Sequence, residues 1–178
     1  MEKIEEIAGV EKENQVIGLM MYTGYPLKLS EHLLMSSEGK CLKKKKIAEE
    51  NSFAFYECAE AGLAPINAIS RKAIINPDVV LGKGIVISPG VILSHGVKIG
   101  DNVILDPAVV MDVNSSLGAH CYISAGVVIS GKCEVEKNVM MGAGVIVESC
   151  LKVGKNQTVA AGTVVSESLD GLYRKESE

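Results

Sequence analysis

The chain has 178 residues, a formal net charge of −4 and only 4% aromatic residues. This length fits one domain with a small appendage, and the mild acidity provides no basic surface for nucleic acid. There is no run of about 18 apolar residues, and no cationic segment precedes an apolar one at the N-terminus, so we expect neither a membrane span nor a secretory signal. The five cysteines form no CxxC pair, which indicates reduced thiols in a cytoplasmic protein.

The first third of the chain, residues 1–66, predicts a small α/β region. A strand is expected at 14–22, and a stretch with two Gly, one Pro and three Ser predicts loops at 23–40. One or two helices are expected at 41–62, where a glycine ends the pattern. Residues 64–70 then read as an extended segment that leads into the rest of the chain.

A six-residue period dominates the sequence from residue 75 to residue 164. Each of fifteen consecutive hexads opens with a large aliphatic residue, and no insertion interrupts them. This period fits neither a simple helix nor a simple strand, but hexapeptide repeats are typical of a parallel β-helix. The opening residues, which we expect to stack as the core, are Ile75, Leu81, Ile87, Leu93, Ile99, Leu105, Met111, Leu117, Ile123, Ile129, Val135, Met141, Val147, Val153 and Val159.

The fourth position of each hexad predicts a corner. In eleven of the fifteen hexads it is Gly, Asn or Asp, the residues that best tolerate a positive φ. Each hexad is therefore one side of a triangular prism, and three hexads make one coil of 18 residues. Five coils stacked like neighbouring strands give a prism about 24 Å long. We predict a mainly β fold, with a parallel β-helix at 67–166 and a polar tail at 167–178.

When successive coils stack, their corners align in three columns, and these columns differ in chemistry. The charged corner, which we interpret as a solvated edge, comprises residues 82–84, 100–102, 118–120, 136–138 and 154–156. The small-residue corner is nearly uncharged and comprises residues 88–90, 106–108, 124–126, 142–144 and 160–162. Such an edge suits either a neighbouring subunit or a long, thin ligand. The third column, here called the His95 corner, is irregular and comprises residues 76–78, 94–96, 112–114, 130–132 and 148–150.

His95 is the candidate catalytic base. It is the residue of its corner that titrates near neutral pH, and its hexad position points outward. A histidine near a carboxylate can act as a general base toward a hydroxyl or an amine, and Asp112 and Asn114 are its expected neighbours. The alternative is an ordinary polar surface residue. No three-histidine zinc site is expected, because His32 lies outside the repeat and His120 belongs to another corner.

The uninterrupted hexads that follow Asn-Ala-Ile-Ser-Arg-Lys-Ala-Ile (67–74) resemble the hexapeptide-repeat acyltransferases. The junction KKKKIAEENSFAFYECAEAGLAPINAISRKAII resembles, more closely, that of the sialic acid O-acetyltransferase and bacillosamine N-acetyltransferase group, and the resemblance covers residues 41–165. It implies a left-handed β-helix and a homotrimer whose active sites lie between neighbouring prisms. It also implies acetyl-CoA as the acyl donor and a histidine, helped by an acidic residue, that takes the proton from the acceptor.

Carried onto this sequence, the resemblance assigns a role to individual positions. The family's histidine falls on Val113, and valine cannot move a proton. A coenzyme contact falls on Tyr122, and the groove for the coenzyme is lined by Ala125, Ala143 and Ala161.

Two functions stay open on the sequence. The first is an acyl-CoA-dependent acyltransferase that acts on a hydroxyl or amine of a sugar, a sugar nucleotide or a similar small molecule. His95, one coil away from Val113, would then serve as the base. The second is a non-catalytic homotrimer, a degenerate transferase that serves as a scaffold or binding module, and Val113 favours this alternative.

Overall fold

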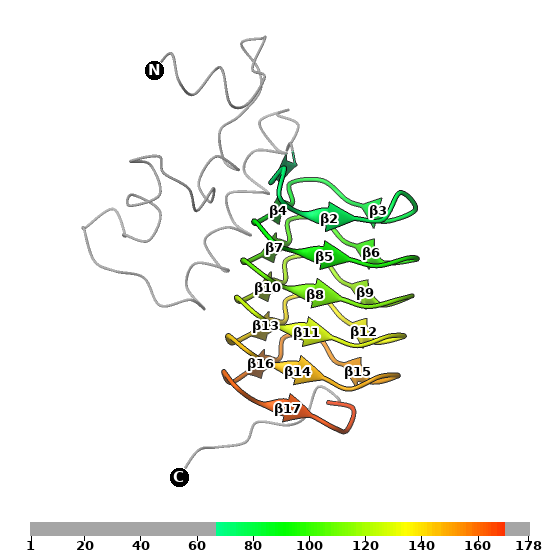
Figure 1. The fold of residues 1–178 in the computed structure, drawn as a ribbon. Coiled ribbons are helices and arrows are strands. Elements are labelled where there is room, and N and C mark those ends of the chain that lie inside the picture. Colours follow the sequence, from blue (N-terminus) through cyan, green and yellow to red (C-terminus); the bar gives the residue numbers. More distant parts are fainter. Residues whose placement is uncertain (1–66, 170–178) are drawn as a thin grey trace, which may run out of the picture.

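The computed structural model describes residues 67–169. The predicted small α/β region and nearly all of the polar tail lie outside the described residues. Within them, two-residue strands alternate with tight turns and wind into a three-sided stack (Figure 1). The predicted mainly β architecture, a parallel β-helix of hexapeptide repeats, is confirmed, and it is consistent with the left-handed form that the resemblance implies.

Three parallel sheets form the sides of the prism, and each takes every third strand of the chain. Sheet 1 consists of β1 (Ala68–Ile69), β4 (Val86–Ile87), β7 (Ile104–Leu105), β10 (Tyr122–Ile123), β13 (Met140–Met141) and β16 (Thr158–Val159). Sheet 2 consists of β2 (Ile74–Ile75), β5 (Ile92–Leu93), β8 (Val110–Met111), β11 (Val128–Ile129), β14 (Ile146–Val147) and β17 (Val164–Val165). Sheet 3 consists of β3 (Val80–Leu81), β6 (Lys98–Ile99), β9 (Ser116–Leu117), β12 (Glu134–Val135) and β15 (Lys152–Val153).

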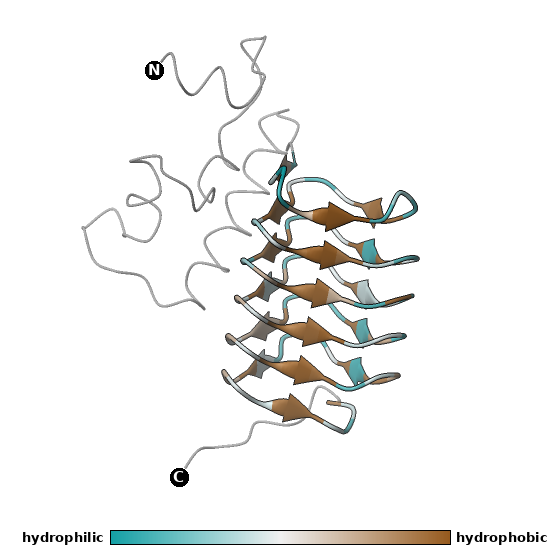
Figure 2. Cartoon of the chain, viewed as in Figure 1, coloured by the Kyte–Doolittle hydropathy of each residue, from teal (hydrophilic) through white to brown (hydrophobic). Residues whose placement is uncertain are grey.

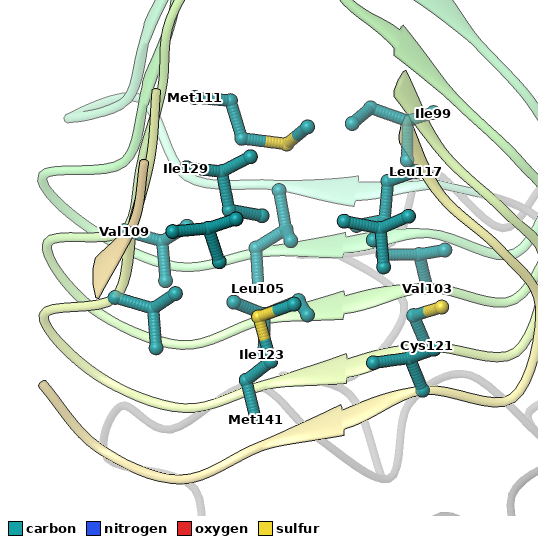
Figure 3. Packing of buried hydrophobic residues seen from close by; sticks show 14 of the residues in the cluster. Ile99, Val103, Leu105, Val109, Met111, Leu117, Cys121, Ile123, Ile129 and Met141 are labelled. Carbon is teal, nitrogen blue, oxygen red and sulfur yellow. The ribbon is translucent and has the colours of Figure 1, made fainter. Parts of the chain in front are cut away.

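Strand register follows the predicted coil. Leu93 pairs with Met111, and Met111 pairs with Ile129, so residues 18 apart lie directly over one another. The first residues of the hexads and most of the fifth residues point inward and fill one continuous apolar core (Figure 3). Because the two inward residues of each hexad stack on those of the hexad 18 residues later, aliphatic side chains form continuous columns along the prism.

The corners impose a left-handed backbone on nearly every fourth hexad position. Of the fifteen positions, fourteen have a positive φ, and Asp78 is the exception. The sequence predicts this conformation where Gly or Asn is present. It also occurs where the residue type disfavours it, with φ of 60–63°, at Ala108, His120, Lys132 and Cys150. The coil geometry therefore overrides the preference of the individual residue.

The outward faces of the three sheets differ. Sheet 2 presents an aliphatic side chain at every strand, and its strands are uniformly apolar in Figure 2; the residues are Ile74, Ile92, Val110, Val128, Ile146 and Val164. After its first strand, β3, the outward residues of sheet 3 are polar or charged. Among them, Lys152 Nζ lies 2.7 Å from a carboxylate oxygen of Glu136 and 3.5 Å from one of Glu134. On sheet 1 the outward side chains of Val86, Ile104 and Tyr122 are buried, those of Ala68 and Met140 are partly buried, and Thr158 is exposed. The prism therefore has one exposed aliphatic side, one charged side and one largely buried apolar side.

The end of the described chain closes the last coil. Leu169 forms an isolated parallel bridge to Val153, and its carbonyl oxygen accepts a hydrogen bond from the amide of Gly154 (2.7 Å). Its own amide donates to Lys152 (2.8 Å), and its side chain packs against the core. Residue 169 thus occupies the place of a sixth strand in sheet 3.

Candidate active site

His95 is held by an aspartate from the neighbouring coil. Its Nδ1 lies 2.7 Å from Oδ2 of Asp78, and the two side chains are 69% and 39% exposed. The same carboxylate oxygen accepts a hydrogen bond from the backbone amide of Gly96 (2.9 Å). Asp78 therefore fixes both the ring and the turn that carries it. With Nδ1 engaged, Nε2 is the ring nitrogen that can accept a proton from a substrate.

The turn that carries His95 rests on Asn114. The carbonyl oxygen of His95 accepts a hydrogen bond from the Asn114 amide (2.9 Å). A Cβ built on Gly96 would collide with the Asn114 side chain, so the glycine allows the two turns to approach closely. Asn114 thus contacts His95 through the backbone.

Asp112 supports its own turn. Its Oδ1 accepts a hydrogen bond from the Val113 amide (2.7 Å), and its carbonyl oxygen accepts one from the hydroxyl of Ser115 (2.6 Å). The structure pairs His95 with Asp78, in the coil before it, and not with Asp112. Val113, which occupies the position of the family's histidine, is 40% exposed.

Sequence reasoning missed Asp78 as the partner of His95. The signal was available in the period, because 78 plus 18 is 96, which stacks Asp78 directly over the residue that follows His95. Asp78 was instead interpreted as a corner residue of the Gly, Asn and Asp type. Among the fourth residues of the fifteen hexads, Asp78 is the one without a positive φ, and its side chain contacts His95.

Ala125, Ala143 and Ala161 stack along the small-residue corner and are exposed. Backbone hydrogen bonds of 2.9–3.0 Å connect the successive turns, from the amide of Gly144 to Ala125 and from that of Gly162 to Ala143. A Cβ built on Gly126, Gly144 or Gly162 would meet nothing within 4 Å. The corner is therefore an open edge, free of bulky side chains over three coils.

Tyr122 is buried beside the small-residue corner. It is an outward residue of sheet 1 but is only 2% exposed, and its hydroxyl donates to Oδ2 of Asp106 (2.8 Å). The other oxygen of Asp106 is buried and has no hydrogen-bond partner among the described residues. The tyrosine belongs to a buried cluster with Val86 and Ile104.

His120 belongs to the charged corner. Asn102 Nδ2, which can only donate, lies 2.9 Å from Nδ1 of His120, so Nδ1 acts as the acceptor of a neutral ring. Burial lowers the pKa of His120, the charge of Asp101 opposes this effect, and the charge of Lys137 adds to it. The ring is a structural element of its corner, away from His95.

A shallow hollow of about 530 Å³ lies over sheet 3 and the charged corner, where Lys98, Ser116, Glu134 and Lys155 line it. It carries charges of both signs and includes none of the candidate residues. Within residues 67–169, no group of three His, Cys, Asp or Glu side chains is placed to hold a metal ion. In the same part of the chain no helix is long and apolar enough to cross a membrane.

Neither a protein-family model nor a curated protein sequence matches the chain. Solved structures do. The perosamine N-acetyltransferase from Caulobacter crescentus, in complex with CoA and GDP-perosamine, is 28% identical with a TM-score of 0.68. The match covers 69% of this chain, which spans 59% of the length of that enzyme.

Two further structures support the fold. The acetyltransferase domain of PglB from Neisseria gonorrhoeae is 21% identical with a TM-score of 0.69, over 94% of this chain and 87% of that one. AntD, an N-acyltransferase from Bacillus cereus in complex with dTDP and 3-hydroxybutyryl-CoA, is 22% identical with a TM-score of 0.56, over 67% of this chain and 81% of that one. The repeat, the three sheets and these similarities together identify residues 67–169 as a hexapeptide-repeat β-helix of the kind found in acyltransferases.

Proposed function

We propose that this protein is an acyl-CoA-dependent acyltransferase that acylates an amine or a hydroxyl of a sugar-type acceptor, with His95 as the general base. The pairing of His95 with Asp78 at 2.7 Å carries the proposal, because a carboxylate that orients an exposed imidazole prepares its other nitrogen to act as a general base. Structural neighbours that bind CoA, acetyl-CoA or an acyl-CoA support the donor, and neighbours bound to GDP-perosamine or dTDP support a nucleotide-linked acceptor.

The proton path starts at the acceptor. His95 Nε2 would take the proton from the acceptor nitrogen or oxygen as that atom forms its bond to the acyl carbon. The protonated ring would then deliver the proton to the coenzyme sulfur as the carbon–sulfur bond breaks. Asp78 keeps Nδ1 protonated throughout and stabilises the positive charge on the ring at the midpoint of the reaction.

The small-residue corner is the proposed site for acetyl-CoA, which supplies the activated acyl thioester. Ala125, Ala143 and Ala161 are exposed, and the glycines beside them leave open space. An extended pantetheine chain can therefore approach the backbone over three coils. The resemblance also matches Tyr122 to a coenzyme contact, but its side chain is only 2% exposed, so the three alanines carry this part of the proposal.

A single copy cannot bring the base and the coenzyme together. The His95 corner and the small-residue corner border opposite edges of sheet 2, whose outward side chains are aliphatic. We propose a homotrimer in which sheet 2 packs against a neighbour, so that His95 of one copy faces the small-residue corner of the next. Exposed aliphatic residues such as Ile74 and Val164, at 65% and 55%, would become buried.

The proposed function is tested by transfer itself. The full-length protein is incubated with acetyl-CoA and a panel of nucleotide-linked amino sugars, and release of free CoA is followed. We expect turnover with at least one acceptor, and a fall of about 10²- to 10⁴-fold in kcat for His95→Gln. A variant as active as the unmodified protein would remove His95 from the mechanism.

The second candidate, a non-catalytic trimeric scaffold, is favoured by one observation. Val113 is exposed at the position of the family's histidine and offers no group for proton transfer. A scaffold that retains the coenzyme groove would show a rise in melting temperature with free CoA and with acetyl-CoA, but no release of CoA with any acceptor. If millimolar CoA or acetyl-CoA did not change the melting temperature, the protein would not bind the coenzyme.

A further inference from the structure

The outward face of sheet 1 is apolar over five consecutive coils. We call this the sheet 1 face, and its members are Ala68, Val86, Ile104, Tyr122 and Met140. The three central side chains are only 2–5% exposed, although they point away from the core of the prism. They form a hydrophobic cluster of their own, separate from the core.

Strand geometry does not explain this burial. Sheet 2 has the same strands, the same spacing and equally apolar outward residues, yet Ile92 and Ile146 are 36% and 41% exposed. An outward aliphatic residue on this prism is therefore accessible unless something lies over it. The sheet 1 face behaves as one half of a packed interface.

The sheet 1 face also contains a polar anchor. The hydroxyl of Tyr122 donates to one oxygen of Asp106, and the second oxygen of this buried carboxylate has no partner among residues 67–169. A buried carboxylate oxygen without a donor is costly. Whatever covers this face is therefore expected to supply a hydrogen-bond donor beside Asp106.

We propose that residues 41–66 of the same chain dock on the sheet 1 face as its cover. Chain connection favours this occupant, because residue 66 directly precedes Asn67 and β1, the first strand of sheet 1. The segment therefore starts from the edge of the sheet that it would cover. A second copy of the chain has no such constraint and would more readily use the larger exposed aliphatic side, sheet 2.

The length and composition of the segment fit the face. A helix over 41–62 would be about 33 Å long, which exceeds the roughly 24 Å from β1 to β16. The segment holds both phenylalanines of the chain, Phe53 and Phe55, as well as Tyr56. Its lysines at 43–46, together with Asn51 and Ser52, are side-chain donors available to Asp106.

Crosslinking in the full-length protein tests the docking. In a Cys41→Ser, Cys150→Ser background, Cys58 is the reactive thiol of the segment, because Cys121 and Cys133 are buried. Val86→Cys or Ile104→Cys adds a thiol on the sheet 1 face, and Ile92→Cys or Val110→Cys adds the matched thiol on sheet 2. On refolding in a glutathione redox buffer, where no reagent has to reach a buried thiol of the folded protein, we expect the disulfide to Cys58 within one chain to form at least about tenfold more favourably for the sheet 1 pair, since docking raises the effective concentration of the two thiols.

Hydrogen exchange gives a second readout that needs no crosslink. Amides in 41–62 of the unmodified protein should be protected, Ile104→Glu should abolish this protection, and the matched Val110→Glu should retain it. Equal crosslinking on the two sheets, crosslinks that join two chains, or exchange of 41–62 at the rate of an unfolded peptide would each overturn the proposal. None of these outcomes depends on acyl transfer, so the docking is tested independently of the proposed function.

Discussion

Asp78 bonds to the ring of His95 and to the amide of Gly96 through the same carboxylate oxygen, at 2.7 and 2.9 Å. The contact crosses from one coil to the next, so the orientation of the imidazole depends on the stacking of the solenoid. A fold that is otherwise built from aliphatic columns thereby holds a titratable group in a fixed place.

Replacing Asp78 tests this relationship. Asp78→Asn retains an acceptor for the Gly96 amide but removes the charge that faces the imidazole. We expect kcat/KM for acyl transfer to fall about 10- to 100-fold, because the base loses its orientation. The free energy of unfolding should change by less than about 1 kcal/mol, because the pair is exposed. The control is Asp101→Asn, whose carboxylate makes a similar bond to the amide of Lys83 in the charged corner (2.8 Å).

The assembly is tested by placing a charge on sheet 2. Ile146→Glu would bury a carboxylate among aliphatic side chains of a neighbour, which is unfavourable by several kcal/mol. We expect the oligomer of the unmodified protein, about three times the 18.9 kDa chain, to dissociate to single chains by analytical ultracentrifugation. The matched control is Val80→Glu, an exposed aliphatic residue on sheet 3. A trimer that withstands Ile146→Glu would contradict packing through sheet 2.

Lys132 tests the strain at the corners. Its φ is 60°, a conformation that costs an ordinary residue about 1–2 kcal/mol and that asparagine tolerates better. Lys132→Asn is expected to raise the free energy of unfolding by about 0.5–1 kcal/mol in chemical denaturation. The reverse change, Asn156→Lys at a φ of 62°, should lower it by a similar amount. No change in either variant would show that the corners carry little strain.

The cysteines are expected to differ sharply in reactivity. Burial raises the pKa of Cys121 to about 12, and burial also raises the pKa of Cys133. Cys150 is exposed at the His95 corner. At pH 8 a maleimide should label Cys150 within minutes and leave Cys121 unmodified until the protein is unfolded, as read by peptide mass mapping. Rapid labelling of Cys121 in the folded protein would contradict the closed core.

His120 predicts a pH dependence of stability. Because burial lowers its pKa below the ordinary value of 6.5, the folded state binds this proton less readily than the unfolded chain does. Its stabilising contribution is full above pH 6.5 and is lost as the pH falls through the folded-state pKa. His120→Asn, which tolerates the positive φ, should flatten the decline in unfolding free energy between neutral and mildly acidic pH. An unchanged decline would assign the effect to other groups.

The sequence predicted the fold well because one geometric rule operates at every coil. The stacking of Leu93, Met111 and Ile129 followed from a period of six, and the observed register confirms it. The conformation of Lys132 and Cys150 could not be predicted from residue type, since the neighbouring coils impose it. Asp78 was missed because a contact between adjacent coils links residues 17 apart, and the composition of a single hexad does not reveal it.

The candidate site could be predicted only in part, because its contacts also join residues of different hexads. His95 and Asn114 share a corner and contact each other through the backbone, but their catalytic roles stay predictions. The roles of Tyr122 and of the three alanines rest on positions matched to a family, and they stay predictions. Outward residues of sheets 1 and 2 look alike in sequence, yet Ile104 of sheet 1 is 2% exposed and Ile92 of sheet 2 is 36% exposed, a difference that no pattern within a hexad reveals.

Leu169 has a consequence for how these molecules meet in solution. Leu169 bonds to the carbonyl oxygen of Lys152 and to the amide of Gly154. These groups lie on the free edge of sheet 3, so they are no longer available to pair with the first coil of another prism. Head-to-tail polymerisation into fibres is thereby disfavoured on the side of sheet 3.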